Sequence, residues 1–198
     1  PIGEIMKLST KFIAITIAFI HLNSFADNSN DTNSLSLIQS TIEDTFTIEE
    51  ERVLVRAIKE NTSAQKAMIS SVNKISTDFN SGKLTEQSMP SYLIDYLKAL
   101  TETHSPASLI NLQKQMAADA NERIVKQNST RSDIFKYFLR NLSEMNKSKQ
   151  TNVHNQIPDN IIVDFSRLLG AFYDTPEIQN KLREPNQNFN ELPHGIIP

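Results

Sequence analysis

The chain has 198 residues, with 20 Lys and Arg against 23 Asp and Glu, which gives a formal net charge of −3. A mildly acidic chain without a cluster of basic residues is a poor candidate for electrostatic binding of nucleic acid. The absence of cysteine excludes a disulfide scaffold, and a total of only four glycines disfavours a sheet protein with many tight turns.

Residues 6–26 carry the three parts of a secretory signal peptide in the expected order. These are a basic region, an apolar run and a small-x-small cleavage sequence, here Lys7 with Lys11, residues 12–20, and Ser24-Phe25-Ala26. The apolar run partitions into the membrane while the lysines stay on the cytoplasmic side. We therefore expect cleavage between Ala26 and Asp27, export of the chain, and a mature protein with a net charge of about −4.

Two other interpretations of this segment were weighed against the signal peptide. A retained membrane anchor needs about 20 apolar residues, whereas the run is interrupted here at His21 and Asn23. A buried N-terminal helix would leave the basic flank and the small-residue exit as coincidences. Residues 1–5 precede the first methionine and are excluded from fold reasoning.

A flexible lead and a helical domain are expected after the cleavage site. Residues 27–33 are entirely polar, so they have no apolar area to bury. The helical domain is predicted over residues 34–184. Its first helix is expected over about 34–45, where three apolar residues recur at helical spacing, namely Leu35, Ile38 and Ile42.

The longest predicted helix begins at a capping box formed by Thr47 and Glu50. We expect it to run without interruption to Phe79, which makes it about 32 residues long. No helix-breaking residue lies between these ends.

One face of this long helix carries residues at alternating spacings of four and three, which is typical of a coiled-coil seam. The seam comprises Leu54, Ile58, Asn61, Gln65, Met68, Val72, Ile75 and Phe79. Two interpretations remain open. The favoured one is packing inside the chain's own bundle; the other is contact with a protein partner or a second copy, in which Asn61 and Gln65 would fix the register.

Two further helices are predicted in the middle of the chain. One is expected over about 89–103, and the next begins with Ser105 as N-cap and Pro106 at the first helical position. Small residues in the second of these would allow another helix to approach closely, namely Ala117, Ala118 and Ala120.

The last three helices are separated by a predicted linker over residues 147–157, a polar stretch without an apolar stripe. Before it, a helix capped by Ser129 or Thr130 has the strongest amphipathic pattern in the chain. After it, one helix follows Pro158 and a short one begins at Thr175-Pro176. The sequence therefore predicts an all-α fold, an irregular bundle of about six or seven helices.

Residues 185–198 are rich in proline and asparagine and predict a tail. Ile196 and Ile197 near its end resemble the start of a further element. This leaves a second interpretation open, in which the chain is cut within a longer protein.

No catalytic, cofactor-binding or metal-binding site is predicted. Three histidines lack a second ligand at helical spacing, namely His104, His154 and His194. Neither a phosphate-binding loop nor a serine-hydrolase turn is present. Glu49-Glu50-Glu51 is interpreted as charge at the positive end of a helix dipole rather than as an acid pair or a cation site.

These observations lead to a functional expectation: an exported, non-catalytic helical protein that acts through protein–protein contacts in a bacterial envelope. Its most concrete form is an accessory periplasmic component of a secretion, conjugation or pilus apparatus. The alternatives are a secreted effector or virulence factor, and a periplasmic enzyme or small-ligand-binding protein with a pocket between helices. The expected partners are proteins, self-association included, and the membrane is met only through the transient signal peptide.

Overall fold

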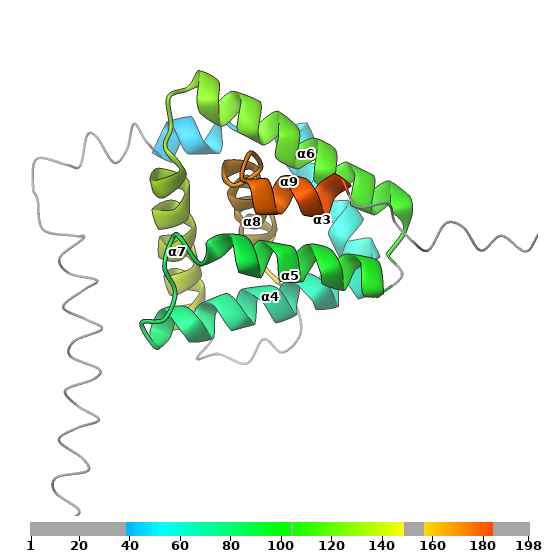
Figure 1. Ribbon diagram of the computed structural model, residues 1–198, viewed down its shortest axis with the longest axis horizontal. Coiled ribbons are helices and arrows are strands. Elements are labelled where there is room, and N and C mark those ends of the chain that lie inside the picture. Colours follow the sequence, from blue (N-terminus) through cyan, green and yellow to red (C-terminus); the bar gives the residue numbers. More distant parts are fainter. Residues whose placement is uncertain (1–38, 104, 149–156, 184–198) are drawn as a thin grey trace, which may run out of the picture.

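The computed structural model describes residues 39–103, 105–148 and 157–183 (Figure 1). Within these ranges the chain consists of helices and turns, without strands, and the helices pack around one apolar core. A helical turn over residues 39–43 precedes the labelled helices. These are α3 (Ile48–Glu60), α4 (Thr62–Asn80), α5 (Met89–Glu102), α6 (Ala107–Lys126), α7 (Arg131–Ser148), α8 (Asp159–Ala171) and α9 (Pro176–Arg183). The all-α prediction is confirmed for the described residues.

Helix α8 is the centre of the fold. Every residue from Ile161 to Ala171 is buried, and α8 packs against α3, α6 and α7, which surround it in Figure 1. A helix that is apolar around most of its circumference has to be enclosed by other elements. Phe165 makes edge-to-face contacts with Tyr96 of α5 and Phe138 of α7, with ring centroids 4.8 and 6.1 Å away.

Helices α6 and α8 approach each other closely at Gly170. A Cβ atom placed on Gly170 would lie 2.5 Å from the Cβ atom of Ala120 and 3.2 Å from the carbonyl oxygen of Ala117. The side-chain amide of Asn121 donates a hydrogen bond to the Gly170 carbonyl at 3.1 Å. The expected close approach along this helix is therefore confirmed at Ala117 and Ala120, and the residue that meets them is a glycine.

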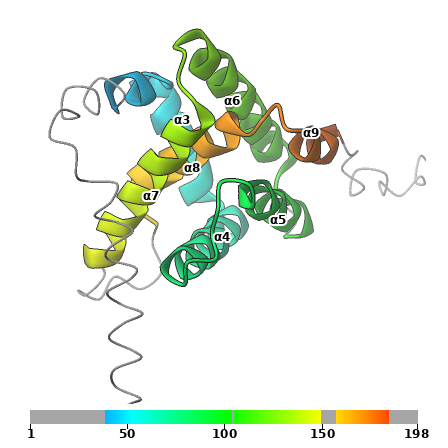
Figure 2. The same ribbon diagram turned by 60° about the vertical axis from the view of Figure 1, so that its left-hand side comes forward.

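The prediction of a single helix from Thr47 to Phe79 is wrong, because the chain changes direction at Asn61 and forms α3 and α4 instead (Figure 2). The Asn61 backbone is extended, with φ −109° and ψ 103°. Its Oδ1 atom accepts a hydrogen bond from the Ala64 N–H at 2.8 Å, and its own N–H donates to the Ile58 carbonyl at 3.2 Å. Asparagine offers the backbone this alternative to the helix. The bend allows α3 to pack on α6 and α8 while α4 packs on α5.

Two helix starts agree with the local signals in the sequence. Thr47 and Glu50 make both hydrogen bonds of the capping box at the start of α3. At the start of α7, the Asp133 N–H donates to the Thr130 hydroxyl and the Thr130 N–H donates to the Asp133 carboxylate, both at 3.1 Å. Thr130 rather than Ser129 is therefore the cap.

Two predicted boundaries are shifted. Pro106 occupies the N-cap position of α6, so Ser105 lies one residue outside it. Helix α7 continues to Ser148, so the first two residues of the predicted linker 147–157 are helical. Shifts of one or two residues at helix ends are common, because the terminal turns make few hydrogen bonds.

Several predictions fall outside the described residues. These are the signal peptide over 6–26, the lead over 27–33 and the tail over 185–198. Among the helices that the structure does describe, none combines the length and the apolar character needed to cross a membrane.

Replacing Phe138 or Leu169 with Asp should unfold the protein. Both side chains are completely buried, and an unpaired charge in the core costs about 3–5 kcal/mol. Thermal unfolding followed by circular dichroism measures the loss. Ile48→Asp is the matched control, because Ile48 is 70% exposed in the first turn of α3. The melting temperature of this variant should differ little from that of the wild type. An unchanged melting temperature in either core variant would contradict the core assignment.

Gly170→Ala should destabilise the protein although alanine is the better helix former. Alanine in a helix contributes about 1 kcal/mol relative to glycine, but here its Cβ atom would push α6 away from α8, and such overpacking costs about 1–3 kcal/mol. The double variant Gly170→Ala with Ala120→Gly removes the shortest of these contacts, the one with the Ala120 Cβ atom. It should unfold at a higher denaturant concentration than the single variant, and equal midpoints would refute the steric explanation.

Candidate functional site

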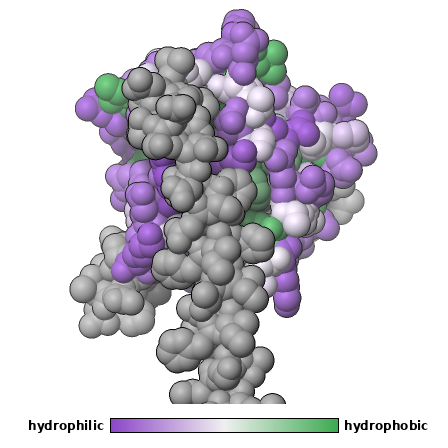
Figure 3. Space-filling view, turned by 90° about the vertical axis from the view of Figure 1, so that its left-hand side faces the viewer, coloured by the Kyte–Doolittle hydropathy of each residue, from purple (hydrophilic) through white to green (hydrophobic). Residues whose placement is uncertain are grey.

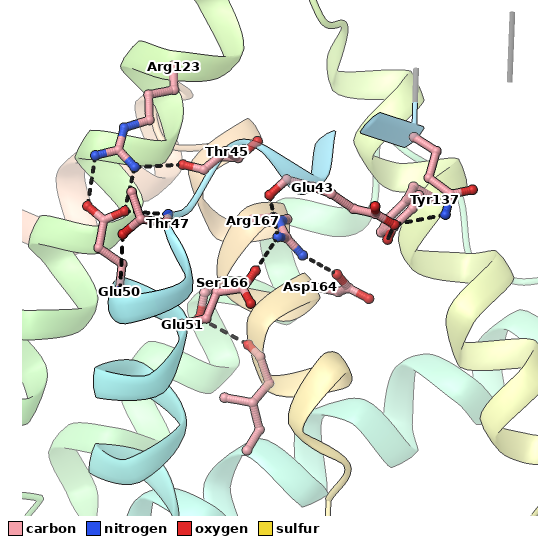
Figure 4. A network of polar contacts seen from close by, with 12 residues as sticks. Glu43, Thr45, Thr47, Glu50, Glu51, Arg123, Tyr137, Asp164, Ser166 and Arg167 are labelled. Atoms are coloured by element: carbon pink, nitrogen blue, oxygen red, sulfur yellow. Dashed lines mark hydrogen bonds and ion pairs between the residues drawn. The ribbon is translucent and has the colours of Figure 1, made fainter. Parts of the chain in front are cut away.

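Polar contacts gather where residues 39–51 meet α6, α7 and α8 (Figure 4). Two arginines belong to this polar network: Arg167 of α8 lies in its middle and Arg123 of α6 at its edge. Each joins its helix to acidic residues near the start of α3. No other region described combines buried charge with contacts between so many elements, so we treat it as the candidate site.

Arg123 holds the start of α3 against α6. Its guanidinium pairs with both carboxylate oxygens of Glu50, at 2.6 and 2.7 Å, and also donates to the Thr45 carbonyl at 2.9 Å. Glu50 accepts a further hydrogen bond from the Thr47 N–H at 2.7 Å. A single carboxylate therefore both caps α3 and binds it to α6, with the two-pronged geometry that arginine forms best.

Arg167 is the more deeply placed of the two, with 4% of its surface exposed. It donates to the Asp164 carboxylate at 2.8 Å, to the Glu51 carboxylate at 2.6 Å and to the Glu43 carbonyl at 2.9 Å. The second carboxylate oxygen of Asp164, itself 2% exposed, accepts from the Asn141 amide of α7 at 2.7 Å. Buried charges are tolerated when they are paired and hydrogen-bonded in this way.

The segment that these arginines hold also buries apolar side chains. Ile42 and Phe46 are 0% and 4% exposed, and the Phe46 ring lies 5.7 Å from the Arg167 guanidinium. On its outer side, the Tyr137 hydroxyl of α7 donates to the Glu43 carboxylate at 3.0 Å. Residues 39–47 are therefore attached by both packing and charge.

The network shifts the pKa values of two of its carboxyl groups, Glu50 and Asp164, in opposite directions. The hydrogen bonds from Arg123 lower the pKa of Glu50 to about 2, against a partial desolvation that raises it. Burial raises the pKa of Asp164 above its usual value, although Asn141 and Arg167 oppose the change. The Glu50 carboxylate therefore stabilises the fold when it is ionised.

The arrangement joins chain segments and does not present a reactive group. Each carboxylate of the network accepts hydrogen bonds from arginine, an amide or a backbone N–H. In the parts of the chain that the structure describes, no group of three or more His, Cys, Asp or Glu is placed to hold a metal ion. The interpretation of Glu49-Glu50-Glu51 as helix-start charge is therefore incomplete, because Glu50 and Glu51 also pair with distant arginines.

The structure places the predicted contact seam mostly in the core. Its buried members are Leu54, Ile58, Met68, Val72 and Ile75, while Gln65 and Phe79 are partly buried. Asn61 is the cap between the two helices. The apolar members thus pack within their own chain, and contact with a partner stays a prediction. Ala26 and Asp27, the predicted cleavage site, lie outside the described residues.

Sequence reasoning missed both arginines. The available signal was in the α8 sequence, where Asp164 and Arg167 are charged residues three apart in an otherwise apolar run. Residues at this spacing face each other on a helix, so a charged pair on an enclosed helix is recognisable. Its third partner, Glu51, lies 116 positions away and has no sequence signal.

The chain was compared with known proteins. No family model, curated protein or solved structure matches it. Any proposal about its role therefore rests on its own residues.

Replacing Glu50 with Gln should remove a stabilisation that depends on pH. Gln can still make the capping bond at this position but has no charge for Arg123. Because the folded pKa of Glu50 is about 2 and the ordinary value is 4.5, its contribution is complete above pH 4.5 and disappears as the pH falls through 2. We expect Glu50→Gln to be less stable than the wild type by about 1–2 kcal/mol at pH 6, allowing for solvent screening.

Urea unfolding of both proteins between pH 2 and pH 7 measures this difference. It should shrink as the pH falls from 4.5 towards 2, since the wild-type carboxylate then becomes neutral as well. A difference that stays constant over this range would contradict the role of the charge. Glu49→Gln is the control, because Glu49 is an exposed neighbour that pairs with Arg52 on the same helix, at 3.8 Å.

Proposed function

We propose that this chain is an exported, non-catalytic helical protein that acts through protein–protein contacts in a bacterial envelope. Its most concrete form is an accessory periplasmic part of a secretion, conjugation or pilus apparatus. The observation that carries the proposal is the ordered signal pattern of residues 6–26, which precedes a helical domain.

The state of the buried charged groups supports a non-catalytic role. A catalytic acid or base has to reach its substrate, whereas Arg167 and Asp164, the two buried charged residues of the described ranges, bind to each other and to neighbouring segments. The absence of cysteine suits a bacterial envelope protein stabilised by its core rather than by disulfides.

The described surface is mainly polar. Three large apolar side chains are exposed on it, Ile48, Val53 and Val125, at 70%, 42% and 63%. On the face seen in Figure 3, hydrophobic colour is confined to separate spots among hydrophilic residues. Isolated apolar residues of this kind are normal for a soluble surface. Partner contact through the coloured part of this face would therefore rely mainly on polar groups.

The proposal predicts a processed, exported protein. Expressed from its first methionine in a bacterium, the chain should be recovered from the periplasmic fraction with Asp27 as its first residue, as determined by mass spectrometry. Ile15→Arg places a charge in the middle of the apolar run, so it should leave an unprocessed protein in the cytoplasm. A wild-type protein that remains in the cytoplasm with Met6 intact would refute the export proposal.

Crosslinking in intact cells tests the contact role. Processed protein should be captured with specific envelope proteins, identified by mass spectrometry. Recovery of the processed protein from the culture medium instead would favour the secreted effector. Processed periplasmic protein that forms no crosslinked species under these conditions would contradict the contact role.

A further inference from the structure

Residues 39–60 form an arm that is attached to the remainder of the protein by contacts between distant positions. Its polar attachments are the Arg123 and Arg167 pairs already described, together with an ion pair between Lys59 of α3 and Asp159 of α8. Its apolar attachments are four side chains that are at most 4% exposed, namely Ile42, Phe46, Leu54 and Ile58. The arm therefore behaves as one element docked on α6, α7 and α8.

A single residue joins this arm to the remaining helices. Glu60 ends α3 and Thr62 begins α4, so Asn61 alone makes the connection. The bend depends on the extended Asn61 backbone and on the hydrogen bond from the Ala64 N–H to its side chain. If Asn61 became helical, α3 and α4 would form one continuous helix from Ile48 to Asn80.

The sequence on both sides of Asn61 favours that continuous helix. The seam keeps its alternating spacing through the bend, from Leu54 and Ile58 to Met68 and Val72. Within the hinge itself, Asn61 holds the bend through its cap on α4, a local interaction whose loss changes an equilibrium by about fivefold. The straight and bent forms of this hinge are therefore close in free energy.

A straightened hinge withdraws the arm from its own chain. Arg167 would then lose Glu51 and the Glu43 carbonyl, and the apolar surface under Ile42 and Phe46 would be exposed. The vacated surface would be covered again by a segment that carries two acidic residues and four apolar residues at the same spacing as in the arm. The arm of a second copy supplies that set, because its sequence is identical.

We propose that Asn61 is the hinge of a domain swap, in which α3 and α4 become one helix and the arm of each copy docks on α6, α7 and α8 of the other. Every contact of the arm with α6, α7 and α8 is made again between chains. The two forms therefore differ in the hinge, including the contacts between α3 and α4, and in the entropy of association. The resulting assembly is a symmetric dimer. This inference does not rest on export and can fail or hold independently of it.

Two substitutions at the hinge shift the equilibrium in opposite directions. Asn61→Ala removes the cap and favours the continuous helix. Since two hinges straighten in each dimer, we expect the dimer dissociation constant to fall by about 25-fold. Asn61→Gly is the matched control, because glycine is tolerated as an N-cap but disfavoured inside a helix. It should dimerise no more than the wild type. Size-exclusion chromatography with light scattering, at several protein concentrations, measures the dimer dissociation constant of the processed wild-type chain and of the two variants.

Introduced cysteine pairs show whether the dimer is swapped, since the chain has no other cysteine. Lys59→Cys with Asp159→Cys places one thiol on each side of the hinge. A short bismaleimide should therefore link two different chains in the swapped dimer, but two positions of the same chain in the monomer. Lys74→Cys with Asp95→Cys replaces an α4–α5 ion pair at 2.6 Å, with both residues beyond the hinge. This control pair should link within one chain in either form.

Denaturing gels of the isolated Asn61→Ala dimer should therefore show covalent dimers with the first cysteine pair and monomers with the control pair. The proposal is overturned if Asn61→Ala remains monomeric at every concentration, or if its dimer is crosslinked within single chains by both pairs. Should Asn61→Ala fail to fold, the same pairs are placed in the wild-type chain refolded at high concentration. Covalent dimers formed by the first pair alone support the swap, and their absence overturns it.

Discussion

Arg167 places a positive charge inside the helical bundle, and the arrangement of the surrounding helices follows from how that charge is accommodated. A buried guanidinium is costly unless its donors meet acceptors of opposite charge or strong polarity. Asp164 on the same helix accepts from one terminal nitrogen, and Glu51 and the Glu43 carbonyl accept from the other, while Nε has no partner among the described residues. Because two of these three partners belong to the N-terminal arm, burying α8 requires the arm to be docked.

Arg123 reinforces this constraint at the edge of the network. Its pairing with Glu50 combines with the capping box, so the start of α3 and its attachment to α6 depend on the same carboxylate. Removing the charge should affect both the helix start and the docking. Through Arg167 and Arg123, the acidic residues at the start of α3 thus attach the N-terminal arm to α8 and α6.

The dependence of the buried arginine on the arm concerns contacts within the chain. Its two buried charged residues in the described ranges, Arg167 and Asp164, bind to each other and to neighbouring segments of the same chain. The arm is attached strongly but joined through one residue, and a second copy carries the only matching arm that the sequence guarantees. Association by exchange of this element requires no exposed apolar patch, in keeping with the polar surface of the described residues.

The sequence by itself determined the helical class and most helix starts. Those features depend on residues within a few positions of one another, as in the bonds between Thr47 and Glu50 or between Thr130 and Asp133. Periodicity also identified the seam from Leu54 to Phe79 as a packing face, with packing in its own bundle favoured over contact with a partner. It did not reveal the bend at Asn61, because the apolar residues of the seam have the same spacing whether α3 and α4 are one helix or two.

Only the tertiary structure decided that bend and the partners of the two arginines. Glu50 lies 73 positions from Arg123, and Glu51 lies 116 positions from Arg167. Pairing over such distances is set by which helices pack together, and packing depends on the whole set of apolar faces at once. Local spacing carries no information about it, so a run of three glutamates was recognisable as a helix start but not as the attachment of the arm.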